Sequence, residues 1–115
     1  MGWSVYLETD GKPVEVELFC EGGTQAVGGS TEAWVSITFN YAEVYFLFNF
    51  DLRKTLDGKK ASTVLPKLKK VWNKLKGCKP FKNDYWAPTP GNAGVPIKLI
   101  LGWAEQHPDA VFRVT

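Results

Sequence analysis

The N-terminal part of the chain shows the alternation of apolar and polar side chains that is typical of β-strands. Two alternating segments, residues 3–9 and 13–20, are separated by the pair Asp10-Gly11. This pair readily takes the positive φ angles of a tight hairpin turn. We therefore predict an antiparallel hairpin at the start of the chain.

Further strands are predicted in the middle and at the end of the chain. Residues 33–41 alternate, with a long apolar face. Residues 43–50 are apolar on both faces and rich in aromatic side chains, which favours a buried strand, although periodicity alone also allows a helix. A short link at residues 41–43 would join these two segments into a second hairpin. Residues 110–115 alternate once more and predict a closing strand.

The spacing of the apolar residues changes to that of a helix over residues 62–76, where they form a single stripe. Ser62 or Thr63 can cap the start of this helix, because their hydroxyl groups accept hydrogen bonds from free backbone amides. Gly77 is typical of a helix end. The face opposite the apolar stripe is rich in lysine.

A second helix is predicted over residues 91–106. Thr89 followed by Pro90 suits an N-cap and a first helical position. Pro96 conflicts with an early start, because proline lacks the amide hydrogen that the helix interior uses. The helix therefore either kinks at Pro96 or begins at Asn92.

These elements predict an α+β fold, with an antiparallel sheet of four to five strands and two helices packed on one face. The length of 115 residues suits one domain, and no stretch rich in glycine, proline or serine divides it. We therefore treat residues 1–115 as a single domain.

Charge is distributed unevenly along the chain. The net charge is −7 over residues 1–52, +10 over residues 53–82 and −1 over residues 83–115. Such asymmetry is typical of a surface for an anionic partner, nucleic acid included, but a solvated helix face explains it equally well. The candidate binding lysines on the first helix are Lys67, Lys69, Lys70, Lys74 and Lys76.

Residues 84–94 bring aromatic residues and prolines together directly before the second helix. Rings that also carry a polar group are common at interfaces, and a helix N-terminus offers backbone amides to an anion. The alternative is a rigid loop whose rings fix the helix onto the sheet. The candidate binding residues of this segment are Asp84, Tyr85, Trp86 and Asn92.

The sequence offers little catalytic chemistry. One histidine and two cysteines argue against a structural zinc site, and we expect no cofactor. The glycine-rich residues 21–30 are expected to connect strands rather than hold phosphate, since no Gly-Lys-Ser/Thr motif follows them. An acid/base site would have to use Asp84, Tyr85 and His107. We favour a capping role for His107 at a helix C-terminus, where the helix dipole favours a cation.

The ends of the chain carry no evident targeting signal. The first residues lack the basic and apolar regions of a secretory signal, and no segment reaches the roughly 20 apolar residues of a membrane-spanning helix. We therefore expect a cytoplasmic protein without a membrane partner. In that compartment Cys20 and Cys78 would be reduced thiols, although a disulfide between them stays open.

Several short motifs occur in the C-terminal two thirds of the chain: Asn40-Tyr41, Leu56 with Gly58, Ser62 with Pro66, Asp84 to Ala93, and Pro108-Asp109. In these motifs the chain resembles a family of small, uncharacterised proteins encoded by phages and prophages. The stretch Asp-Tyr-Trp-x-Pro-Thr-x-Gly-Asn-Ala is the most specific of them, whereas Pro96 departs from the family pattern. The resemblance implies no activity. It implies a phage-like accessory protein of the bacterial cytoplasm.

We therefore expect a non-enzymatic module that binds a macromolecule through the lysine face of the first helix and the loop before the second. A competing hypothesis is direct binding of nucleic acid by the lysines, which would weaken steeply as salt rises. A second is a small enzyme with Asp84, Tyr85 and His107, and a third is self-association through the aromatic sheet. The sequence leaves the partner and the oligomeric state open.

Overall fold

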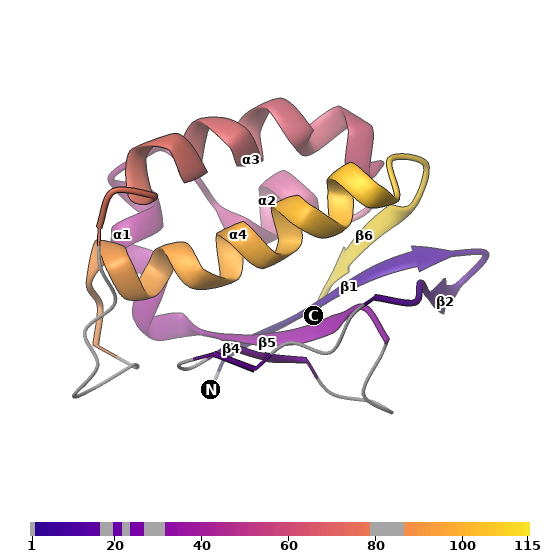
Figure 1. The fold of residues 1–115 in the computed structure, drawn as a ribbon, viewed down its shortest axis with the longest axis horizontal. Coiled ribbons are helices and arrows are strands. Elements are labelled where there is room, and N and C mark those ends of the chain that lie inside the picture. Colours follow the sequence, from indigo (N-terminus) through magenta and orange to yellow (C-terminus); the bar gives the residue numbers. More distant parts are fainter. Residues whose placement is uncertain (1, 17–19, 22–23, 27–31, 79–86) are drawn as a thin grey trace.

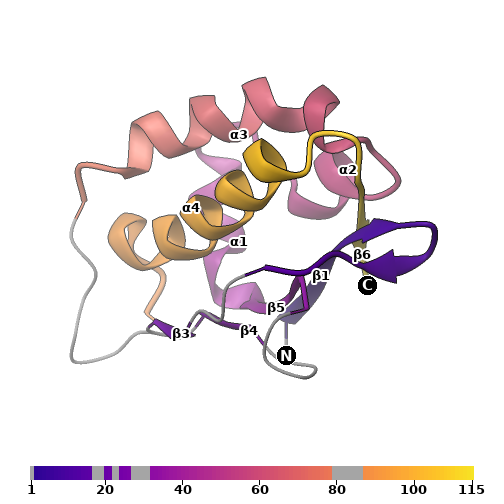
Figure 2. The same ribbon diagram turned by 45° about the vertical axis from the view of Figure 1, so that its right-hand side comes forward.

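The computed structural model describes residues 2–16, 20–21, 24–26, 32–78 and 87–115. In this part of the chain, one antiparallel sheet forms a layer and the helices gather on one of its sides (Figure 1). This arrangement confirms the predicted α+β class. The turned view shows the helices α3 (Ala61–Leu75) and α4 (Pro90–Gln106) lying side by side above the sheet (Figure 2).

Strand β1 (Gly2–Thr9) is the centre of the sheet. Its Val5 lies opposite Val35 of β5 (Trp34–Thr38) on one side and opposite Val114 of β6 (Val111–Val114) on the other. The short strands β4 (Thr24–Ala26) and β3 (Cys20–Glu21) follow beyond β5. Strand β6 confirms the predicted closing strand. Strand β4 and Glu21 of β3 lie in residues 21–30, which we expected to connect strands.

The predicted N-terminal hairpin is present, but its second strand is much shorter than expected. Asp10 and Gly11 have φ angles of 53° and 78°, as a tight turn requires, and β2 (Lys12–Pro13) pairs with the end of β1. Beyond β2, the Val14 carbonyl accepts from the Ala33 amide and the Leu7 amide donates to the Ala33 carbonyl. The chain leading into β5 thus occupies the side of β1 with which a longer second strand would pair. Residues 17–19 of the predicted strand lie outside the described part.

The prediction of a strand over residues 43–50 is wrong, and the strand predicted over residues 33–41 ends early. The chain leaves β5 through a 3-10 turn, Phe39–Tyr41, and continues into helix α1 (Ala42–Phe46). The Oγ1 atom of Thr38 caps this turn by accepting a hydrogen bond from the Asn40 amide, at 3.2 Å. Of the rings in this segment, those of Tyr45 and Phe50 are buried, whereas Phe46 is exposed.

A short helix, α2 (Leu52–Leu56), was not predicted. The Oδ1 atom of Asp51 accepts from the Lys54 amide at 3.0 Å and caps its first turn. Leu52 and Leu56 are buried on one side of this helix. Five residues are too few for a periodic pattern, so α2 leaves no helical signal in the sequence.

Helix α3 confirms the first predicted helix but not its cap. It begins at Ala61, so Ser62 and Thr63 lie inside its first turn. The Ala61 and Ser62 amides instead donate to the carbonyls of Ala110 and Pro108, at 2.8 and 2.9 Å. Backbone carbonyls of a distant segment thus replace a side-chain cap, a substitution that no local pattern reveals.

Helix α4 confirms the second predicted helix and its N-cap. Thr89 accepts a hydrogen bond from the Asn92 amide, and the helix begins at Pro90 and continues through Pro96. It packs closely on α3, because a Cβ at Gly94 would lie only 3.2 Å from the Cβ of Leu75. The core between sheet and helices includes Val5, Leu7, Val35, Ile37, Leu68, Val71, Ile97, Ile100, Phe112 and Val114.

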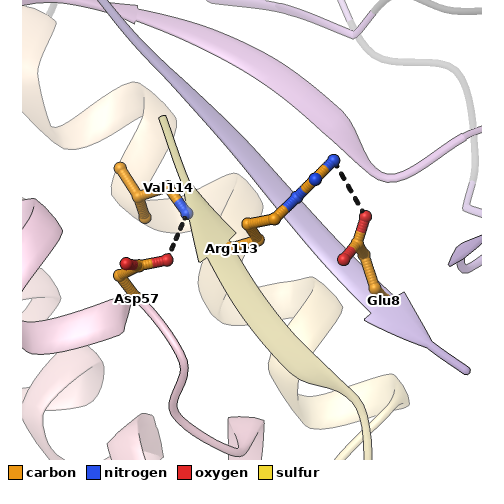
Figure 3. A network of polar contacts seen from close by, with 4 residues as sticks. All are labelled: Glu8, Asp57, Arg113 and Val114. Carbon is orange, nitrogen blue, oxygen red and sulfur yellow. Dashed lines mark hydrogen bonds and ion pairs between the residues drawn. The ribbon is translucent and has the colours of Figure 1, made fainter. Parts of the chain in front are cut away.

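Polar contacts cover the outer edge of β6. The Oδ1 atom of Asp57 accepts from the Val114 amide at 3.0 Å (Figure 3). The Gly58 amide donates to the Phe112 carbonyl at 2.9 Å. Unpaired strand edges invite association with other strands. The segment that follows α2 therefore closes this edge of the sheet.

Candidate functional site

The lysines of α3 divide between two surfaces. Lys67, Lys70 and Lys74 face the turn that follows α1, whereas Lys69 is exposed elsewhere on the helix. Lys76 lies just after α3 and lines a separate, smaller pocket with Lys98 of α4. The sequence could not show this division, because it depends on where the neighbouring turn packs.

A groove of about 530 Å³ separates the first three lysines from the turn. We call it the lysine groove. Its other wall is largely apolar, and the side chain of Leu47 in it is 78% exposed. Asn49 has a φ of 55°, a left-handed conformation that asparagine tolerates and that reverses the chain here. The groove is lined by Leu47, Phe48, Asn49, Phe50, Thr55, Lys67, Lys70, Val71 and Lys74.

The charge of the lysine groove is not balanced from within the described part of the chain. There, no carboxylate lies within 4.0 Å of the ammonium groups of Lys67, Lys70 or Lys74. The two ion pairs found in the same residues join Lys60 to Asp109 and Arg113 to Glu8. The groove therefore combines positive charge on one wall with exposed apolar surface on the other.

A second pocket, of about 320 Å³, opens on the other side of α1. We call it the aromatic pocket. Its walls come from β1, the 3-10 turn, α1 and the start of α2, and most of its surface is apolar. It shares Phe50 with the lysine groove. The aromatic pocket is lined by Trp3, Phe39, Ala42, Tyr45, Phe46, Phe50, Asp51, Leu52 and Arg53.

The described part of the loop before α4 begins at Ala87. Asp84, Tyr85 and Trp86 lie outside the described residues. Asn92 is only 2% exposed, and its side-chain amide donates to the Ala87 carbonyl at 3.0 Å. Asn92 thus connects the end of the incoming loop to α4 and is too buried to form part of a binding surface.

His107 occupies the C-cap of α4, as its position in the sequence predicts. One of its ring nitrogens, Nε2, lies 3.2 Å from the carbonyl oxygen of Glu15. The other two members of the hypothetical acid/base site, Asp84 and Tyr85, lie outside the described residues. Through this contact His107 connects the end of α4 to the segment that follows β2.

The face of the sheet opposite the helices carries a row of stacked side chains. The Tyr6 and Trp34 rings are parallel with centroids 5.8 Å apart, and the Arg113 guanidinium lies 4.5 Å from the Tyr6 centroid. Arg113 also pairs with Glu8 at 3.2 Å (Figure 3). Because Trp34 and Arg113 come from strands on opposite sides of β1, they flank the Tyr6 ring from both sides. The side chains of this row therefore already contact one another.

Cys78, close to the end of α3, is an exposed free thiol. Among the described residues, no three histidine, cysteine or acidic side chains gather in a way that could hold a metal ion. In the same residues, no helix has the length and apolar character needed to cross a bilayer. The lysine groove and the aromatic pocket are therefore the candidate binding sites in the described part of the chain.

Comparison of the chain with protein-family models gives no match, and searches of curated proteins and of solved structures give none either.

Proposed function

We propose that this protein is a non-enzymatic binding module that holds an acidic, partly apolar segment of a partner protein in the lysine groove. The observation that carries the proposal is that three lysines, which form no ion pair with any described residue, lie opposite an exposed apolar wall. Carboxylates of the partner would face Lys67, Lys70 and Lys74. Its apolar side chains would cover Leu47, which water surrounds in the free protein.

The two-sided chemistry of the groove favours a protein partner over nucleic acid. A phosphate backbone would use the lysines and leave the apolar wall exposed, whereas an acidic peptide with apolar residues uses both walls. Arginine, which most often reads bases, is also absent between Lys59 and Lys82. Nucleic-acid binding remains the alternative against which the proposal is tested.

The lining of the lysine groove supports a binding rather than a catalytic role. It carries no carboxylate, imidazole or thiol among the described residues, so the lysines have no acid/base partner there. The resemblance to phage-encoded proteins supports a bacterial setting, and we propose that the partner is met in the bacterial cytoplasm.

Fluorescence anisotropy with three probes tests the proposal: a labelled peptide of alternating Glu and Leu, a single-stranded DNA and a double-stranded DNA. We expect the peptide to bind. The charge-reversed variant K67E/K70E/K74E should weaken that binding about tenfold, because three exposed ion pairs contribute roughly 0.5 kcal/mol each. The matched control K69E/K76E/K98E changes the net charge by the same amount outside the groove and should bind nearly as well as the wild type.

Two outcomes would contradict the proposal. Equal weakening in both triple variants would mean that only the overall charge matters. Binding to either DNA in preference to the peptide, lost steeply with added salt, would assign the lysines to nucleic acid instead.

A further inference from the structure

The aromatic pocket is shaped to receive a ring. Trp3 and Phe39 meet edge to face with centroids 4.8 Å apart, and Tyr45 meets Phe50 in the same way at 5.6 Å. These contacts hold the walls in fixed orientations. The hydroxyl group of Tyr45 is bound to the carbonyl of Ala93, so this wall presents ring surface rather than an unpaired polar group.

Two large apolar side chains are exposed at the mouth of the aromatic pocket. Phe46 is 64% exposed and Phe39 is 40% exposed, and both line the opening. Leu47, which follows Phe46 directly, is 78% exposed and belongs to the lysine groove. Exposed apolar surface of this extent next to a pocket is typical of an interaction site.

The volume of the aromatic pocket sets the size of its occupant. A cavity of about 150 Å³ in an unrelated protein is large enough for benzene. The aromatic pocket, at about 320 Å³, therefore has room for one aromatic side chain together with part of its backbone. It lies at the lower limit of pockets that hold whole drug-sized molecules, roughly 300 Å³.

The charges around the mouth decide between an anionic and a cationic occupant. Aromatic walls also attract cations, and Asp51 lines the pocket. The carboxylate of Asp51, however, already accepts a hydrogen bond from the Lys54 amide. Arg53 is exposed at the mouth and has no ion pair within the described part of the chain, and the lysine groove adjoins through Phe50. The charges of Asp51 and Arg53 offset each other at the pocket itself, so the excess of positive charge comes from Lys67, Lys70 and Lys74 of the adjoining groove. This excess favours an occupant that carries carboxylates.

We infer that the aromatic pocket receives an aromatic side chain of the same acidic segment that the lysine groove holds, with a neighbouring carboxylate of that segment directed to Arg53. This inference rests on the proposed function, because it assigns both surfaces to one partner. It adds the chemistry of recognition: an aromatic anchor next to acidic residues. A guanidinium group binds a carboxylate through two parallel hydrogen bonds, which would fix the orientation of the anchor.

The first test uses 3-phenylpropionate, a small probe with one ring and one carboxylate, in an NMR titration. We expect shifts of the backbone amide signals of Ala42 and Arg53 in the wild type. Ala42→Leu, which fills the pocket from α1, should abolish the shifts. Phe46→Ser, which removes an exposed wall without touching the core, should reduce the shifts. This variant provides the test if Ala42→Leu disturbs folding. Absence of shifts at these positions in the wild type would overturn the inference.

The second test compares two peptides by anisotropy, the Glu-Leu peptide and the same peptide with one Leu replaced by Trp. Only the Trp peptide offers a large ring to the aromatic pocket, so Trp should tighten binding by about tenfold. Ala42→Leu should remove this gain, whereas K67E/K70E/K74E should weaken both peptides and keep the gain.

These outcomes separate the two proposals. A Trp gain that survives in Ala42→Leu and in Phe46→Ser overturns the anchor while the lysine groove stands. Peptide binding that is insensitive to K67E/K70E/K74E overturns the proposed function, and with it the assignment of both surfaces to one partner, even if 3-phenylpropionate occupies the pocket.

Discussion

The hydroxyl group of Tyr45 donates a 2.8 Å hydrogen bond to the carbonyl of Ala93, and this bond joins α1 to α4 across 48 residues of sequence. Both residues are buried. The bond fixes the Tyr45 ring, which forms part of the aromatic pocket, against the N-terminal part of α4. The shape of the pocket thus depends on a contact between two helices that are distant in sequence.

Tyr45→Phe should lower the free energy of unfolding by about 1 to 2 kcal/mol. The variant keeps the ring but removes the donor, so it loses one hydrogen bond in a buried site where water cannot replace it. Urea unfolding followed by far-UV circular dichroism measures the effect. An unchanged midpoint and slope would show that the bond contributes nothing to stability.

The same tyrosine predicts a loss of stability at alkaline pH. Burial, with a further contribution from neighbouring Tyr41, raises the pKa of Tyr45 well above its ordinary value of 10.0. Above about pH 10 the unfolded chain therefore loses this proton while the folded chain keeps it, so the free energy of unfolding falls as pH rises, by up to roughly 1.4 kcal/mol per pH unit.

Comparison with Tyr45→Phe isolates this contribution from the other tyrosines and the lysines. Below about pH 9 the wild type should be the more stable of the two, and its advantage should shrink as pH rises above about 10. Urea unfolding of both proteins at several pH values measures the difference. A constant difference across this range would contradict the raised pKa.

Two glycines of α4 should respond differently to alanine. A Cβ at Gly102 meets nothing within 4 Å, so Gly102→Ala should raise the free energy of unfolding by about 0.5 to 1 kcal/mol, the helix preference of alanine over glycine. At Gly94 the added Cβ lies 3.2 Å from the Cβ of Leu75. Gly94→Ala should therefore lose this gain by pushing α3 and α4 apart. Thermal unfolding of the two variants provides the test, and equal stabilisation by both would rule out a tight helix contact.

Substitutions of Asp57 and Asp109 by alanine provide a second comparison of two similar changes. Asp57→Ala leaves the Val114 amide without its partner and should cost about 1 kcal/mol, up to about 2. The helix dipole does not favour a carboxylate at the end of α2, so a stabilising effect of Asp57 would come from its bond to β6. Asp109→Ala should change little, because its side chain is 94% exposed and lies 3.9 Å from Lys60. Similar effects of the two substitutions, measured by chemical unfolding, would contradict this account of the β6 edge.

The sequence by itself determined the elements whose signals are local. The apolar stripes of α3 and α4 repeat over several turns, and Thr89 with Pro90 marks the start of α4. The Asp10-Gly11 turn is specified by two residues that tolerate positive φ. Alternation located β1, the core of β5, and β6, because each of these strands buries one face.

Tertiary structure alone decided the rest, because it depends on partners distant in sequence. Residues 43–50 are apolar enough for a strand, but residues up to Phe46 belong to helix α1. The hydrogen bond from Tyr45 to Ala93 joins this helix to α4. The approach of the chain to β5 limits β2, and carbonyls of residues 108–110 cap α3 in place of a side chain. The same packing brings the turn after α1 beside Lys67, Lys70 and Lys74, so the lysine groove has no signature in the spacing of its residues.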